Sequence, residues 1–171
     1  MKETCLRSLR LILAIAVIAC WVTTVARAQT PKKLLVVTVT KGFRHSSIPT
    51  AEKVLEKLAT KSGAFTVDFV KNEAEMAAKM TAESLKQFDG VIFANTTGDL
   101  PLPDKQAFLN WIKSGKAFVG MHSATDTFRG HTPLDPYVEM IGGEFKHHGA
   151  QVEVECINQD YTLSLHDALP I

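Results

Sequence analysis

Apolar residues in this chain gather in short runs separated by polar loops. Four of the runs are rich in β-branched residues and contain few polar positions, which is typical of strands buried on both faces of a parallel sheet. They span residues 33–40, 65–70, 91–94 and 116–121. An alternating run at 151–157 predicts a fifth strand.

Helical periodicity fills the intervals between these runs. Apolar residues at 51–59 share one helical face. Ser46 or Ser47 supplies the N-cap of this helix, ahead of Pro49 in its first turn. Four further helical segments are predicted. Their signals are, in chain order, a capping box, short helical turns, a face of aromatic residues and a short apolar run. They involve residues 72–75, 81–88, 103–113 and 138–141.

The alternation of strands and helices predicts an α/β fold built from βαβ units with right-handed crossovers. Such units form a doubly wound, mostly parallel sheet. The chain has no internal repeat and no obvious linker, so we expect one domain. In such sheets ligands bind beyond the carboxyl ends of the strands, where the loops gather. The loops that follow the strands are therefore the places to look for function.

The beginning of the chain does not fit this pattern. A basic segment, an apolar run at 11–22 and a small-x-small site ending at Ala28 predict that residues 1–28 are a signal peptide. The run is shorter than the roughly 20 residues that cross a bilayer, which disfavours a membrane anchor. The residues up to Cys20 also resemble a lipoprotein box, which would anchor the mature protein through Cys20. In either case we expect an exported protein, periplasmic or extracellular, with no membrane span after cleavage.

The last segment, residues 161–171, fits neither strand nor helix logic. It resembles a peptide that arises when sequencing adapter is translated at the end of a fragmentary gene. We therefore expect a non-native tail, and a native domain at 32–160 that is C-terminally truncated and incomplete.

Charge and cysteine content disfavour some classes of function. The chain has a formal net charge of +1, and the predicted signal carries +3 of it, which leaves −2 on the remainder. A nucleic-acid surface needs an excess of basic residues, so no nucleic-acid partner is expected. Cys156 is the one cysteine beyond the predicted signal, so the domain is expected to fold without an internal disulfide.

Polar side chains follow three of the predicted strands. They are His45, Ser46, Ser47, Thr96, Thr97, Asp99, His122, Ser123, Thr125 and Asp126. Because the carboxyl ends of parallel strands meet at one edge of a sheet, we expect these side chains to converge. A lone histidine is usually a surface or structural residue, but two histidines at one edge favour a functional pair.

The segment from Gly120 to Ala124 lies where a doubly wound hydrolase or amidotransferase places its nucleophile elbow. The exposed position holds His122, neither serine nor cysteine, so a covalent acyl intermediate is not expected. An ordinary polar loop is the other interpretation of the segment.

In the functional interpretation, His122 and His45 form a general acid/base pair. Asp126 orients His122, and Arg129 binds an anionic or hydroxyl-rich ligand.

A metal site is the alternative use of the histidines, with His45, His122 and His147 as candidate ligands. No HxH or HExxH spacing supports it, and adjacent His147 and His148 also fit a solvated turn. No glycine-rich phosphate loop follows the first strand, so a nucleotide cofactor is not expected. A divalent metal is the one cofactor left open.

Three motifs together resemble a known family. They are Thr40 to Ile48, Gly120 to Phe128, and Ile141 to Phe145 followed by His147 and His148. They are similar to the ThuA-like, or trehalose-utilisation, domain, which is related in fold to class I glutamine amidotransferases. The resemblance covers residues 32–160 and implies a flavodoxin-like sheet and a role in sugar metabolism. The cysteine nucleophile of the amidotransferases has its counterpart near His122, which argues against glutamine hydrolysis.

The sequence therefore predicts an exported protein that acts on a sugar or an oxidised glycoside by histidine acid/base chemistry. The catalytic candidates are His122, His45 and Asp126. The ligand-binding candidates are Gly42, Phe43, Ser46, Thr97, Ser123 and Arg129. A non-catalytic carbohydrate-binding or scaffolding module and a metal-dependent hydrolase stay open as alternatives. The expected partner is a small-molecule sugar or glycoside, and the oligomeric state is not predicted.

Overall fold

Four parallel strands form the centre of the molecule. The computed structural model describes residues 30–150 and 152–153 of the chain. The strands are β1 (Lys32–Val37), β2 (Phe65–Val70), β3 (Gly90–Ala94) and β4 (Ala117–Met121). They are ordered β2-β1-β3-β4, and each neighbouring pair is parallel. This is the strand order of a flavodoxin-like, doubly wound sheet, so the predicted fold class is confirmed.

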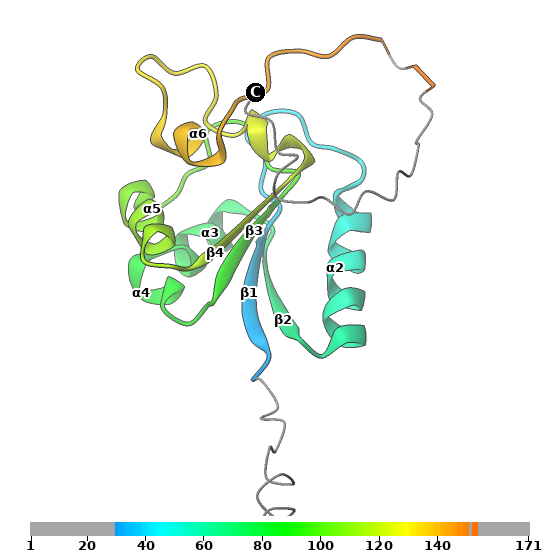
Figure 1. Cartoon of the computed structure of the whole chain (residues 1–171), viewed down its shortest axis with the longest axis vertical. Coiled ribbons are helices and arrows are strands. Elements are labelled where there is room, and N and C mark those ends of the chain that lie inside the picture. Colours follow the sequence, from blue (N-terminus) through cyan, green and yellow to red (C-terminus); the bar gives the residue numbers. More distant parts are fainter. Residues whose placement is uncertain (1–29, 151, 154–171) are drawn as a thin grey trace, which may run out of the picture.

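Helices cover both faces of the sheet (Figure 1). One face carries α2 (Ile48–Ser62), and the other carries α3 (Glu73–Lys79), α4 (Ala82–Leu85) and α5 (Lys105–Lys113). After β4 the chain continues through a short 3-10 helix, η1 (His122–Asp126), and then α6 (Pro136–Ile141). The three-layer arrangement leaves the loops after β1, β3 and β4 together at the carboxyl end of the sheet.

The element bounds follow local signals, with some differences. Asn72 caps α3 by accepting a hydrogen bond from the Glu75 backbone at 2.9 Å. The Glu75 carboxylate accepts from the Lys71 amide rather than from Asn72, so only half of the predicted capping box forms. The first strand ends at Val37, earlier than predicted, because the following residues leave the β1–β2 ladder and turn toward the loop after β3.

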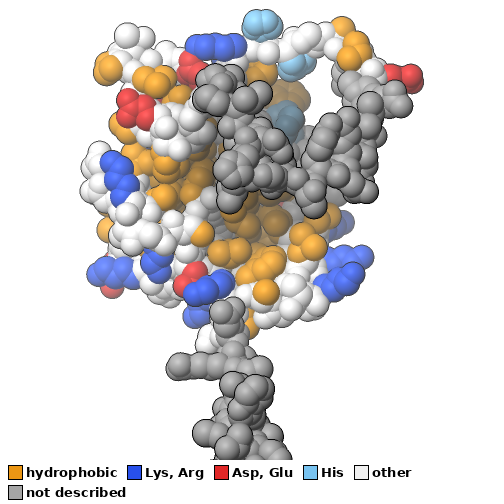
Figure 2. All heavy atoms as spheres, in the orientation of Figure 1, with side chains coloured by type: hydrophobic (Ala, Val, Ile, Leu, Met, Phe, Trp, Pro, Cys, Tyr) orange, Lys and Arg blue, Asp and Glu red, His pale blue; other side chains and the backbone are white. Residues whose placement is uncertain are grey.

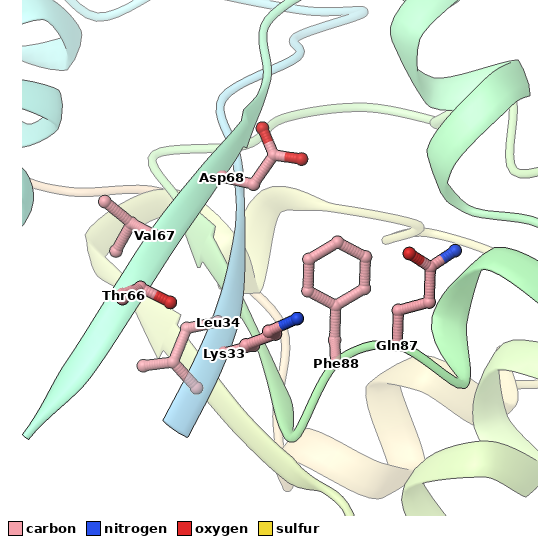
Figure 3. A pocket seen from close by; sticks show the side chains of 7 residues that line it. All are labelled: Lys33, Leu34, Thr66, Val67, Asp68, Gln87 and Phe88. Atoms are coloured by element: carbon pink, nitrogen blue, oxygen red, sulfur yellow. The ribbon is translucent and has the colours of Figure 1, made fainter. Parts of the chain in front are cut away.

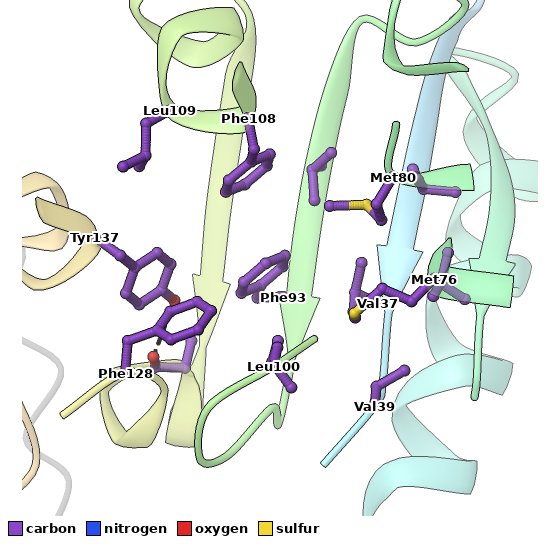
Figure 4. Packing of buried hydrophobic residues seen from close by; sticks show 14 of the residues in the cluster. Val37, Val39, Met76, Met80, Phe93, Leu100, Phe108, Leu109, Phe128 and Tyr137 are labelled. Carbon is purple, nitrogen blue, oxygen red and sulfur yellow. Dashed lines mark hydrogen bonds between the residues drawn. The ribbon is translucent and has the colours of Figure 1, made fainter. Parts of the chain in front are cut away.

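Strand periodicity divides the core between the two faces of the sheet. Val36 and Ile92 belong to the smaller cluster beneath α2. The larger cluster has Phe93 near its centre, with ring centroids 5.6 Å from both Phe108 and Tyr137 (Figure 4). Full burial of one such side chain stabilises the fold by about 1.5–3 kcal/mol. Because Tyr137 comes from α6, this packing also fixes the segments that follow β4.

The β4 strand is the sheet edge next to β3 in the part of the chain that the structure describes. Figure 2 shows hydrophobic side chains gathered in the middle of the face in view, with most Lys and Arg side chains around its rim. Val119 of β4 is 48% exposed. The predicted fifth strand at 151–157 falls mostly outside the described residues, and the two residues described there form no strand.

The predicted signal (1–28) and tail (161–171) lie outside the described residues and stay predictions. Within residues 30–150 and 152–153, no helix is long and apolar enough to cross a membrane.

Candidate functional site

A cavity of about 570 Å³ lies at the carboxyl end of the sheet. Three segments that are distant in the sequence line it: the loop after β1, the segment that begins at η1, and the segment after α6. Their lining residues are Phe43, His45, His122, Ser123, Thr125, Asp126, Arg129, Phe145 and His148. The predicted convergence is therefore observed for the loops after β1 and β4, whereas the loop after β3 contributes no residue to the lining of this cavity.

The turn from β4 into η1 is sharp and sterically restricted. His122 has φ +48°, a left-handed conformation that non-glycine residues seldom adopt. A Cβ atom added at Gly120 would lie 3.2 Å from the Cβ of Ala124, so both flanking positions must be small. These are the steric features expected of an elbow that exposes one side chain, and the exposed side chain is His122.

The imidazoles of His45 and His122 are in edge-to-face contact. Their ring centroids are 4.6 Å apart with an interplanar angle of 72°, and the centroid of the Phe43 ring lies 4.9 Å from that of His45. Among the described residues, the histidine ring nitrogens that hydrogen-bond to protein are those of His131 and His148. Within the described residues, the ring nitrogens of the His45–His122 pair form no hydrogen bond to protein.

Asp126 lies in the cavity wall with its side chain 16% exposed, and its carboxylate forms an ion pair with Arg129. Within the described residues no hydrogen bond joins it to His122, so the orienting role of Asp126 stays a prediction. The Arg129 guanidinium also lies 5.5 Å from the centre of the Phe145 ring. Arg129 thus links two of the three segments that line the cavity.

Thr97, in the loop after β3, holds in place the loop after β1 that carries His45. Its hydroxyl donates to the Phe43 carbonyl at 2.9 Å and accepts from the Gly42 amide at 3.2 Å. The Lys41 amide donates to the Thr97 carbonyl at 2.8 Å. Thr97 is fully buried and does not line the cavity, so its observed contacts are with protein.

Gly98 connects the loop after β3 to the segment that begins at η1 and carries His122. Its amide donates to the Asp126 carbonyl at 3.0 Å, and its carbonyl accepts from the Phe128 amide at 3.3 Å. Gly98 has φ +73°, and a Cβ atom there would lie 3.0 Å from the Gly42 nitrogen. Only glycine satisfies both requirements without strain. The loop after β3 therefore sets the spacing between the His45 and His122 segments.

A hydrogen bond anchors the third segment to η1, because the Phe145 amide donates to the Thr125 carbonyl at 2.8 Å. The buried Tyr137 hydroxyl of α6 donates to the Ala124 carbonyl at 2.9 Å, and burial raises the pKa of this tyrosine. Hydrogen bonds from Lys146 and from the Gly130 amide lower the pKa of the Glu144 carboxyl next to Phe145. These contacts hold the segment after α6 against η1, and Phe145 and His148 of that segment line the cavity.

Apart from Thr97, which is buried and bonded to the loop after β1, the predicted site residues fall into three groups. His45, His122, Asp126, Phe43, Ser123 and Arg129 line the main cavity. Gly42 lines a neighbouring cavity of about 320 Å³. Ser46 and His147 are exposed and line neither cavity. Ser123 has a buried hydroxyl with no hydrogen-bond partner among the described residues.

Sequence reasoning did not assign Phe145 or His148 to the cavity. Both follow α6, where no strand end marks a site, and His148 was open to interpretation as part of a solvated turn. The available signal was the third motif of the family resemblance, which includes both positions.

The histidines that the structure describes do not form a metal site of three ligands. In the part of the chain that the structure describes, no three His, Cys, Asp or Glu side chains are grouped as a metal ion would require. The metal candidates His45 and His122 are adjacent, but His147 is not in the cavity. Metal binding therefore stays a prediction.

A smaller hollow of about 220 Å³ lies nearer the amino ends of the strands (Figure 3). Its lining residues are Lys33, Leu34, Thr66, Val67, Asp68, Gln87 and Phe88. It contains no histidine, and the Asp68 carboxylate is already paired with Lys79 at 2.9 Å. This arrangement offers no acid/base pair.

Comparison with known proteins agrees with the motifs at the carboxyl-end cavity. The ThuA family, described as trehalose utilisation, matches residues 33–170. The chain belongs to the ThuA family. A search of curated proteins gives no match.

One solved structure resembles this ThuA chain, a crystal structure of a protein described as ThuA-like from Bacteroides uniformis ATCC 8492. The two are 22% identical with a TM-score of 0.46, and the match covers 68% of this chain and 46% of the other. The chain thus spans less than half the length of that structure. Family membership is established by the match over 33–170, and the chemistry at the cavity remains a matter for proposal.

Proposed function

We propose that this ThuA-family chain is an exported protein of sugar metabolism that acts on a sugar or an oxidised glycoside. The ligand binds in the carboxyl-end cavity, and His122 and His45 act on it as general acid and base. The observation that carries the proposal is the contact between these two imidazoles, 4.6 Å apart at the wall of a cavity of about 570 Å³.

The chemistry of the pair supports acid/base catalysis. An imidazole can donate or accept a proton near neutral pH, which makes histidine the most frequent general acid or base. Two imidazoles side by side can serve one ligand, one nitrogen accepting a proton from a hydroxyl while the other donates to a leaving or carbonyl oxygen. The left-handed turn at His122 holds its ring at the cavity wall and ties the position of that ring to the backbone.

The remaining lining suits a hydroxyl-rich ligand. Small-molecule sites combine aromatic surface with a few polar groups that fix orientation. Phe43 and Phe145 provide aromatic surface, while the Arg129–Asp126 pair provides donors and acceptors for hydroxyl groups. A volume of about 570 Å³ is within the usual range for such sites. Export through residues 1–28 is part of the same proposal, because glycans are available outside the cytoplasm.

The proposal is tested with His122→Asn and His45→Asn. Asparagine tolerates the left-handed conformation at residue 122 better than other residues, so His122→Asn removes the imidazole with little backbone strain. We expect turnover of a keto-disaccharide to fall by about 10²–10⁴-fold in each variant, while calorimetric sugar binding changes less. His147→Asn, at an exposed position outside the cavity, is the matched control.

Unchanged binding and unchanged turnover in both variants would overturn the proposal. Wild-type protein that binds sugar and never converts it supports the rival function, a non-catalytic carbohydrate-binding module. Among residues 30–150 and 152–153, no grouping of side chains favours the metal-dependent hydrolase over these two functions.

A further inference from the structure

The neighbouring cavity of about 320 Å³ adjoins the main cavity and shares three residues with it. These are Phe43, Asp126 and Arg129. The residues that belong to the neighbouring cavity alone are Gly42, Gly98 and Asp99. A ligand that contacts the shared residues from the main cavity therefore has space to extend on their other side.

The shared wall presents both an aromatic surface and polar groups. Phe43 is 70% exposed to solvent, which is unusual for a large apolar residue. The Arg129 side chain is 45% exposed, and its guanidinium has more donors than one carboxylate partner can use. Aromatic surface next to charged hydrogen-bonding groups is the combination that small-molecule sites use.

Gly42 and Gly98 line the neighbouring cavity where the loops after β1 and β3 pack closely against each other. Gly98 and Gly42 approach so closely that a Cβ atom on Gly98 would lie 3.0 Å from the Gly42 nitrogen. A Cβ atom on Gly42 would lie 3.3 Å from the Thr97 hydroxyl. The two glycines therefore allow the two loops to meet at the wall of this cavity.

Asp99 supplies the polar group that distinguishes the neighbouring cavity. Its carboxylate lies 2.9 Å from the Nε2 atom of His131, and the two side chains are 65% and 45% exposed. One carboxylate oxygen is engaged by the imidazole, and the other is available to accept from a ligand hydroxyl. His131 is an orienting partner for Asp99 and does not line the cavity itself.

We propose that the neighbouring cavity is a subsite for the part of the glycoside that lies away from the His45–His122 pair, its aglycone or second ring. The proposal rests on the function proposed above and adds a recognition role for Asp99. The reacting ring occupies the main cavity, Phe43 contacts both parts of the ligand, and Asp99 accepts a hydrogen bond from the remote part. One-ring ligands do not reach Asp99, whereas two-ring ligands do.

The test compares Asp99→Asn with Asp68→Asn by titration calorimetry. Both positions carry an exposed carboxylate with one basic partner, and Asp68 lies at the amino-side hollow. The probes are methyl α-glucoside and trehalose, each in unmodified and keto form. We expect Asp99→Asn to weaken trehalose binding about tenfold, because a hydrogen bond to a charged carboxylate is replaced by a weaker one to a neutral amide oxygen. Methyl glucoside binding should change less than twofold, and Asp68→Asn should affect neither probe.

An equal effect of Asp99→Asn on both probes, or no effect on either, overturns the subsite and leaves the proposed function intact. Wild-type protein that binds none of the probes overturns the proposed function, and the subsite with it.

Discussion

The two ends of the sheet differ in what their residues are free to do. At the amino side, the hollow of about 220 Å³ is walled by regular strands, and its carboxylate is already paired with a lysine. At the carboxyl end, the cavity of about 570 Å³ is walled by loops, and two imidazoles keep their ring nitrogens unbonded within the described residues. The backbone ladder defines the amino side, whereas hydrogen bonds between loops, made by backbone and side-chain groups, define the carboxyl end.

This difference explains why the carboxyl end can carry chemistry. Parallel strands end together there, and the chain leaves the ladder at left-handed residues, including Asn95 after β3 and His122 after β4. The departure at His122 places its imidazole in the cavity wall, whereas Asn95 is buried and donates a hydrogen bond to the Ser47 hydroxyl. The amino side has no such departures beside its hollow, since residues of β1 and β2 form most of its wall.

Of the substitutions that compare the two ends of the sheet, we expect the largest effect on stability at Thr97. Thr97→Val removes the buried hydroxyl that bonds Phe43 and Gly42, and we expect a loss of about 1–3 kcal/mol in the free energy of unfolding. Sugar binding should weaken as well, because the His45 loop is held by these bonds. Thr66→Val, at an exposed position in the amino-side wall, should stay within about 0.5 kcal/mol of wild type.

Urea unfolding and calorimetry measure both variants of this pair. Thr97→Ser keeps the hydroxyl and should retain most of the stability that Thr97→Val loses. Equal stability of Thr97→Val and Thr66→Val would contradict the idea that side-chain bonds hold the carboxyl-end loops.

A smaller effect is expected for the basic residues of the two ends. Arg129→Gln removes the partner of the half-buried Asp126 and donors to a ligand, and sugar binding should weaken about tenfold. Lys33→Gln, in the amino-side wall, should leave sugar binding unchanged. Titration calorimetry with the same sugar measures the binding affinity of both variants. A similar loss of affinity in both would contradict the distinction between the two ends of the sheet.

The smallest effect concerns acid stability at Glu52 of α2, near the carboxyl end. Burial raises the pKa of this carboxyl, but hydrogen bonds from Lys71 and Thr38, with the charges of Lys71 and Arg44, outweigh burial and lower it below 4.5. A lowered pKa in the folded state means that the stabilisation is present above pH 4.5 and is lost as the pH falls through the lowered value.

Glu52→Gln should therefore reduce stability at neutral pH by no more than about 1 kcal/mol and show a weaker loss on acidification than wild type. Unfolding curves recorded between neutral pH and the acid transition measure this. A steeper acid dependence in Glu52→Gln than in wild type would mean that the direction of the pKa change is wrong.

The fold could be predicted because its elements are encoded locally. The β-branched run at 91–94 and the amphipathic face of α5 each specify a structure from a few neighbouring residues. The position of His122 at a sharp turn followed from the motif between Gly120 and Ala124, since the steric demands of that turn are local as well.

The site could be predicted only in part, because several of its contacts join residues far apart in sequence. Thr97 was expected to bind ligand, but its buried hydroxyl bonds the loop after β1 instead. Phe145 reaches the cavity through a backbone bond to Thr125 that no periodicity encodes. Such loop-to-loop bonds depend on where the strands end in space, which composition and spacing do not determine.

The most direct test of the central claim is to follow backbone amide NMR signals while a glycoside is added to the chain. The account predicts that signals of Phe43, His122 and Phe145 shift with one common dissociation constant, while those of Lys33 and Gln87 stay in place. Shifts confined to the amino-side residues, with none at His122, would contradict it.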